Sequence, residues 1–137
     1  MPCPPYGSLF TADEAKRLEE MAAIKSFYRD SGFDVAREFD DLPDHLCVEL
    51  EFLQALGHRE ETATDPKEVA WARKCSIAFI DRFVLSFVKR LSAIAEAAEP
   101  GNLYTQLLTA TRHVVSEHRA TLDAKINCAE QERGHLT

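Results

Sequence analysis

The sequence predicts an all-α protein. Only five of its 137 residues are glycine, no stretch alternates β-branched with polar residues, and apolar residues recur at the three-to-four-residue period of an amphipathic helix. These observations predict a helical bundle with about four main helices.

The first two helices are predicted from their start and stop signals. The first is expected to begin at a capping box formed by Thr11 and Glu14 and to end at Gly32. The second is expected to start near residues 41–43, because proline is tolerated in the first turn of a helix, and to end around Gly57.

The third helix has a clear start, at the N-cap Asp65 followed by Pro66, and its pattern runs to Ala98. A straight helix of this length would measure about 50 Å, so a bend or break is expected inside it. The fourth helix is expected to begin near Leu103. The polar segment 127–137 beyond it is expected to be a flexible tail.

Length and composition predict one domain spanning residues 1–137, with 45% apolar residues to build a core. No basic leader and no long apolar run precede or interrupt the domain, so neither export nor membrane insertion is expected. The cysteines lie far apart in the sequence, which predicts reduced thiols in a cytoplasmic protein. They are Cys3, Cys47, Cys75 and Cys128.

The charge is negative overall and concentrated in one region. A net charge of −7 argues against a nucleic-acid-binding surface. Residues 30–68 hold twelve carboxylates and only three lysines or arginines, so the rest of the chain is slightly basic. Two interpretations remain open: solvated helix ends with an acidic loop, or a surface that attracts a basic ligand or peptide.

Motifs for common enzyme classes are absent. The sequence has no GxxxxGK[ST], GxGxxG, GxSxG or HExxH motif. A diiron bundle needs two Glu-x-x-His pairs, and the chain has one such pair, Glu132 and His135. His113 and His118 are five residues apart, do not share a helical face well, and are expected at the surface. No catalytic residue, metal or cofactor is therefore expected, and the chain is not expected to be an enzyme.

Two groups of residues admit both a structural and a functional interpretation. On an uninterrupted helix His45 and Glu49 would project into the apolar arc and could pair with each other, either as a structural contact or as part of a site. The aromatic residues of the third helix could pack in the core or line a groove for an apolar helical peptide. They are Trp71, Phe79, Phe83 and Phe87.

A resemblance favours one of these interpretations. Residues 43–53, PDHLCVELEFL, are similar to the PDHLxxELEFL signature of the TorD/DmsD/NarJ family of cytoplasmic molybdoenzyme chaperones. Residues 79–87 resemble its FLxxHLxxW segment, with Phe83, Val84 and Phe87 at the His, Leu and Trp positions. Residues 5–10 resemble the P-Y-x-S-x-Y/F stretch of the family, and residues 27–33 resemble its FYxxxGF segment.

The resemblance implies a TorD-like helical chaperone, with the later part of the family fold and without its first helices. Its partner would be the signal or N-terminal peptide of the catalytic subunit of a molybdopterin oxidoreductase, often a client of the twin-arginine route, held until cofactor insertion. A fold without these helices would expose apolar surface. This suggests either a homodimer that covers the surface or a chain that has been shortened. The alternative is a helical scaffold protein that does not bind a client.

The residues expected at the client-peptide site are those of the signature and its aromatic neighbours. They are Asp41, Pro43, Asp44, His45, Glu49, Phe52, Phe83 and Phe87.

Overall fold

The structure, a computed structural model, describes residues 4–7, 13–33 and 43–136. These residues form five α-helices and one π-helical segment. The only strand-like feature among them is an isolated antiparallel bridge between Tyr6 and His45. The predicted all-α fold is therefore confirmed.

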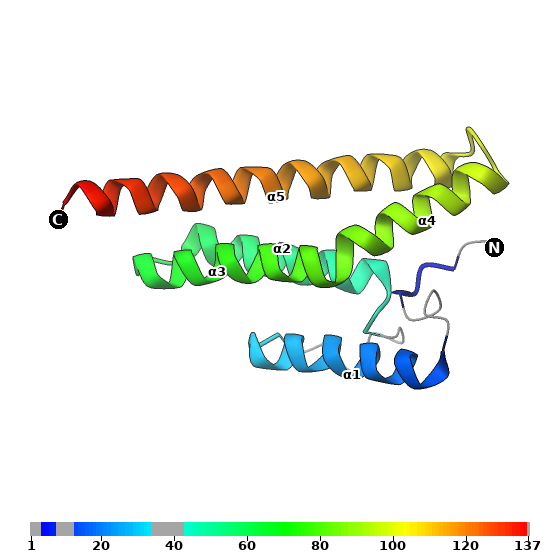
Figure 1. The fold of residues 1–137 in the computed structure, drawn as a ribbon, viewed down its shortest axis with the longest axis horizontal. Coiled ribbons are helices and arrows are strands. Elements are labelled where there is room, and N and C mark those ends of the chain that lie inside the picture. The colour runs from blue at the N-terminus through cyan, green and yellow to red at the C-terminus, as the bar shows by residue number, and fades with distance from the viewer. Residues whose placement is uncertain (1–3, 8–12, 34–42, 137) are drawn as a thin grey trace.

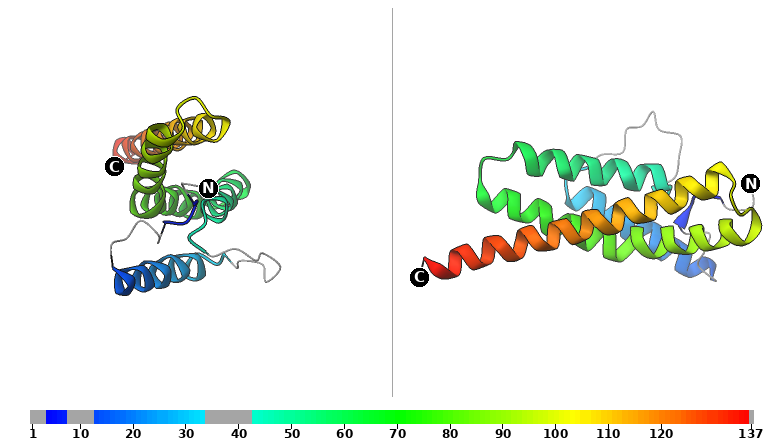
Figure 2. Two further views of the ribbon diagram at one scale, coloured as in Figure 1. Left: turned by 90° about the vertical axis from the view of Figure 1, so that its right-hand side faces the viewer. Right: turned by 90° about the horizontal axis from the view of Figure 1, so that it is seen from above.

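The helices lie in three levels (Figure 1). α5 covers α4 and α3, α2 packs beside α3, and α1 lies on the opposite side of this middle level from α5. The end-on view in Figure 2 shows α1 set apart from the other helices, and the view from above shows α5 crossing the middle level obliquely.

α1 (Glu14–Asp30) begins one residue after its N-cap, Asp13, whose side chain accepts a hydrogen bond from the backbone N–H of Ala15. The predicted N-cap Thr11 lies outside the described residues, and Glu14 is the first residue of the helix, so the predicted capping box is wrong. The predicted end is confirmed. Gly32 has a φ of 75°, the left-handed conformation in which glycine commonly ends a helix.

α2 (Leu46–Thr62) begins and ends later than predicted. Pro43 does not lie in its first turn, because His45, with an extended backbone, is the N-cap and Pro43 lies in a turn before it. The helix continues through Gly57 to Thr62, since a single glycine costs only about 1 kcal/mol within a helix.

The predicted third helix is confirmed together with its break. α3 (Pro66–Phe79) has the expected N-cap, Asp65, and first-turn proline. It is followed by a π-helical segment, η2 (Ile80–Val84), and then by α4 (Leu85–Ala98). The wider π turn changes the direction of the chain between α3 and α4 (Figure 1).

α5 (Leu103–His135) starts where predicted, with Asn102 as its N-cap, but it continues to His135. The predicted end near Ile126 is wrong, because polar residues continue a helix as well as apolar ones once it has formed. Leu122 on this helix is buried, with 1% of its surface exposed.

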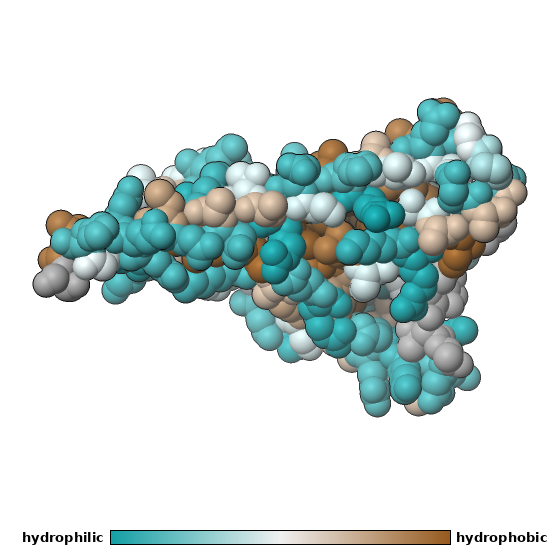
Figure 3. Space-filling view, turned by 45° about the horizontal axis from the view of Figure 1, so that its top comes forward, coloured by the Kyte–Doolittle hydropathy of each residue, from teal (hydrophilic) through white to brown (hydrophobic). Residues whose placement is uncertain are grey.

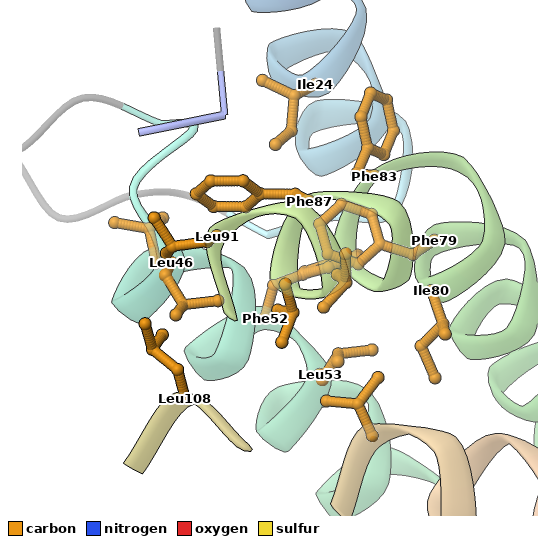
Figure 4. Packing of buried hydrophobic residues seen from close by; sticks show 14 of the residues in the cluster. Ile24, Leu46, Phe52, Leu53, Phe79, Ile80, Phe83, Phe87, Leu91 and Leu108 are labelled. Atoms are coloured by element: carbon orange, nitrogen blue, oxygen red, sulfur yellow. The ribbon is translucent and has the colours of Figure 1, made fainter. Parts of the chain in front are cut away.

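An aromatic cluster joins α1 to the middle level. The rings of Phe52 and Phe79 lie 4.6 Å apart between centroids, and Phe27 and Tyr28 of α1 contact both of them. Figure 4 shows Phe52, Phe79 and their apolar neighbours pointing into the space between the helices. α1 is thus held chiefly by ring contacts, each of which adds about 0.5–1.5 kcal/mol to the free energy of burial.

Candidate functional site

The signature segment 43–53 links α1 to the start of α2. Pro43 and Asp44 are buried immediately before α2. The Tyr28 hydroxyl of α1 donates a hydrogen bond of 2.8 Å to the backbone carbonyl of Pro43. Part of the signature therefore serves as an anchor for α1.

His45 caps α2. Its backbone is extended, with φ −68° and ψ 137°, and its Nδ1 atom accepts a hydrogen bond of 3.0 Å from the N–H of Cys47. The expectation that His45 and Glu49 share a helical face is wrong, because His45 precedes the helix. The cap satisfies one of the backbone donors of the first turn of α2.

Glu49 lies in the core. Only 2% of the residue is exposed, and its Oε2 atom has no hydrogen-bond partner among the described residues. Burial raises the pKa of Glu49 well above its ordinary value of 4.5, and the charge of Asp44 raises it further. Burial and the charges of Glu49 and Asp44 also raise the pKa of the Tyr28 phenol. The environment favours the protonated, neutral form of Glu49.

A short N-terminal segment, Pro4–Gly7, packs against this region. The Leu46 N–H donates to the Pro5 carbonyl at 3.0 Å, and the Gly7 N–H donates to the Asp44 carbonyl at 3.1 Å. The Tyr6 ring meets the His45 ring edge-on, with 4.9 Å between centroids. Residues that resemble two separate family motifs thus lie side by side.

The aromatic residues of the predicted site also belong to the core. Phe52, Phe83 and Phe87 are at most 8% exposed, and Phe87 lies close to the N-terminal segment (Figure 4). Trp71 is 38% exposed beneath the Arg59 guanidinium. The core interpretation of Phe79, Phe83 and Phe87 is therefore confirmed. Asp41 lies outside the described residues.

A groove of about 450 Å³ lies elsewhere, between α2 and α5. Leu50, Leu53 and Gly57 of α2 line it, and Val114 and Val115 of α5 form the facing wall. A Cβ atom on Gly57 would have no neighbour within 4 Å, so the groove is open there. The polar side chains around it are Gln54, His58, Glu61 and His118.

The groove uses the second face of the signature helix. Glu49 and Phe52 are buried in the core, Leu50 is partly buried at the groove, and Leu53 belongs to the core cluster and also lines the groove. Val114 is 67% exposed on α5, although it is β-branched and apolar. Figure 3 shows that apolar side chains also reach the surface of the face drawn there, between polar ones.

The groove is not predicted from the sequence. Leu50 and Leu53 fall on one broad apolar face of the helix that the sequence predicts, and no local feature of that face distinguishes a core residue from a groove residue. Gly57 was a usable signal, because a glycine inside a helical pattern can mark an open or closely approached surface.

Other kinds of site find no support in the described part of the chain. It contains no group of three or more histidine, cysteine or acidic side chains placed to hold a metal ion. Its helices are all too short or too polar to span a bilayer. Cys47, Cys75 and Cys128 are free thiols.

Comparison with known proteins identifies a family. A family model described as nitrate reductase delta subunit matches residues 1–93. These residues contain α1, α2, α3, η2 and most of α4, with the signature segment and Pro4–Gly7. No curated protein matches the chain, and no solved structure matches it.

Proposed function

Because the chain belongs to the nitrate reductase delta subunit family, we propose that it binds the signal or N-terminal peptide of a molybdopterin oxidoreductase catalytic subunit. The family indicates a maturation chaperone of molybdoenzymes rather than a catalyst. In this proposal the chaperone holds the subunit until its cofactor is inserted, and then releases it.

The observation that carries the proposal is the apolar groove between α2 and α5. Its volume of about 450 Å³ is within the range of about 300–1,000 Å³ that is typical of ligand sites. Leucines on one wall and valines on the other suit the apolar face of a helical peptide. The α2 wall belongs to the signature helix, within the matched residues 1–93, and the α5 wall lies beyond them.

Charge supports a basic client. Glu61 lies at the groove, and Glu51 is exposed on the same helix. Arg59, the cation of α2, is engaged by the Glu68 carboxylate, the Ser31 carbonyl and the Trp71 ring. An excess of carboxylates attracts a peptide with adjacent arginines and speeds its association.

The predicted site residues then act mainly by placing α2. Pro43, Asp44 and Glu49 are buried, and we propose that they hold α2 against α1 so that Leu50 and Leu53 face the groove. Phe52, Phe83 and Phe87 support the same helix from the core. Asp41 belongs to the acidic region 30–68, and it remains a proposed residue of the client-peptide site.

The test is calorimetric titration with the N-terminal peptide of a molybdopterin oxidoreductase subunit encoded in the same genome. Val114→Lys places a charge in the groove and repels a basic peptide, so it is expected to weaken binding at least tenfold, or about 1.4 kcal/mol. Leu18→Lys is the matched control. Leu18 is similarly exposed, at 69%, but it lies on α1, on the opposite side of the molecule.

Three results are informative. Loss of binding in Val114→Lys alone supports the groove. Equal weakening by both variants assigns the effect to net charge and removes the groove as the site. Absence of binding by the wild-type chain contradicts the proposed function and favours the scaffold alternative.

A further inference from the structure

The N-terminal segment Pro4–Gly7 binds the body of the protein as an extended peptide would. Two backbone hydrogen bonds hold it, from Leu46 N to Pro5 O and from Gly7 N to Asp44 O. They flank the antiparallel bridge between Tyr6 and His45. The backbone of residues 44–46, which we call the 44–46 edge, therefore presents one donor and one acceptor to an extended partner.

The donor of the 44–46 edge needs an external partner. Leu46 is the first residue of α2, and the N–H groups of a first helical turn have no acceptor within the helix. The partial positive charge at this helix end also favours a carbonyl oxygen as the ligand. Both hydrogen bonds involve only backbone atoms of the segment, so other extended sequences can make them.

Side chains add selectivity at two positions. The Tyr6 ring packs edge-on against the His45 ring. A Cβ atom on Gly7 would lie in van der Waals contact with the Phe87 ring and the Asp44 carbonyl, 3.8 Å from each, so alanine fits and a larger side chain is expected to crowd these neighbours. The site thus suits an aromatic residue followed by a small one.

The segment is short, and its residues are of intermediate exposure. A peptide of the same sequence can make the same backbone hydrogen bonds and the same ring contact. Its apparent affinity depends on the fraction of molecules in which the internal segment has left the edge. The site can therefore exchange its own segment for a similar one.

We infer that the 44–46 edge is a binding site for an extended peptide, which Pro4–Gly7 occupies within the same chain and which an extended stretch of the client takes over. The inference rests on the proposed function for the identity of the competing peptide. Leu50, the first groove residue of α2, lies about 6 Å further along the helix than Leu46. One client can thus place an extended stretch at the edge and a helical stretch in the groove.

The first experiment uses the chain's own sequence as the probe. A synthetic peptide of residues 4–10, PPYGSLF, is titrated into the full-length wild type and into Tyr6→Ala. Tyr6→Ala removes the ring contact that holds the internal segment, so the peptide is expected to bind this variant at least tenfold more tightly than the wild type. Tyr6→Phe keeps the ring that packs against His45, so the peptide is expected to bind this variant more weakly than it binds Tyr6→Ala.

Hydrogen exchange locates the binding. The Leu46 amide is expected to exchange faster in Tyr6→Ala than in the wild type, and to regain protection when the peptide is added. Gly7→Pro, which removes the N–H that donates to Asp44, is a second variant expected to loosen the segment. Peptides with alanine in place of the tyrosine, or valine in place of the glycine, are expected to bind at least tenfold more weakly.

The client peptide completes the test. Tighter binding of the client to Tyr6→Ala than to Tyr6→Phe supports the exchange. Equal binding to both, with weaker binding to Val114→Lys, overturns the exchange and leaves the proposed function intact. Binding of PPYGSLF to Tyr6→Ala without any client binding supports the edge as a peptide site and contradicts the proposed function. Failure of PPYGSLF to bind any variant overturns the inference.

Discussion

Glu49 is the residue of the signature whose role the structure changes most. A solvent-exposed glutamate is charged at neutral pH, but Glu49 is buried beside Asp44, and both its burial and this neighbour raise its pKa. The folded chain therefore keeps the Glu49 proton at pH values at which the unfolded chain has lost it. Glu49 consequently makes stability depend on pH.

Replacing Glu49 by glutamine is expected to remove this dependence. The stabilising effect of the Glu49 proton is complete below pH 4.5, the ordinary pKa, and is lost as pH rises toward the higher pKa of the folded state. Urea denaturation between pH 5 and pH 8 should show the free energy of unfolding of Glu49→Gln rising relative to that of the wild type. Glu51→Gln, an exposed neighbour on α2, is the control. A constant difference between Glu49→Gln and wild type across this range would contradict the assigned protonation.

At the scale of the element, η2 separates α3 from α4 and forms ion pairs with helices on both sides of this middle level. Its two charged residues point to different helices: Asp81 pairs with Arg119 of α5, and Arg82 pairs with Glu20 of α1. Phe83 and Val84, which follow them, are buried. The π-helical segment thus forms ion pairs with α5 and α1, while its apolar side chains remain in the core.

Thr105 closes the turn between α4 and α5. Its hydroxyl lies 2.8 Å from the Glu99 carbonyl and 3.3 Å from the Ala95 carbonyl, and the residue is 2% exposed. These carbonyls also accept backbone hydrogen bonds, Ala95 from the Glu99 N–H and Glu99 from the Asn102 N–H, so the Thr105 hydroxyl is an additional donor at the end of α4. The sharp turn is completed by Gly101, whose φ is 77°.

Thr105→Val is expected to lower the free energy of unfolding by about 1 kcal/mol, because the shape is kept but the hydrogen bonding of a buried hydroxyl is lost. Thr111→Val is the matched control, since the Thr111 hydroxyl bonds only within α5, to the Leu107 carbonyl, in an exposed position. Chemical denaturation of both variants measures the difference. A similar loss in both would mean that the α4 end does not depend on Thr105.

At the scale of the whole molecule, Glu60 holds three helices together. Its Oε1 atom accepts from Arg73 of α3 at 2.8 Å and from Lys125 of α5 at 3.2 Å, while Glu60 itself belongs to α2. Burial alone would raise the pKa of Glu60, but the hydrogen bonds and charges of Arg73 and Lys125 outweigh it and lower the pKa. This network fixes α5 relative to α2, the two helices that form the walls of the groove.

Glu60→Gln is expected to lower the free energy of unfolding by about 1 kcal/mol at pH 7, since the ion pairs are partly solvated. The sign of the pH dependence is opposite to that of Glu49. The contribution of Glu60 is present above pH 4.5 and is lost as pH falls through the lower folded pKa, so variant and wild type should converge in acid. Denaturation at pH 7 and pH 3, with exposed Glu61→Gln as control, measures this. An unchanged difference at pH 3 would argue against the ion pairs as the cause.

The resemblance and the family model agree on the family, and the structure shows which signature residues are buried. Pro43, Asp44 and Glu49 could be assigned from the sequence as important residues, yet their burial could not. Helical periodicity gives the direction of a side chain only inside a helix, and His45 lies before α2. The groove-lining residues of α5 lie beyond the matched residues 1–93, so no family signal pointed to them.

Local sequence signals predict the all-α class, the helix starts at Asp65-Pro66 and near Leu103, the stop at Gly32 and the need for a break within residues 65–98. These features depend on local preferences of a few neighbouring residues. Three features follow only from the tertiary structure: which side of the signature helix is covered, the pairing of Pro4–Gly7 with the 44–46 edge, and the groove between α2 and α5. Each depends on packing between segments far apart in the sequence, where the bend at η2 and the burial of the aromatic cluster outweigh local propensity.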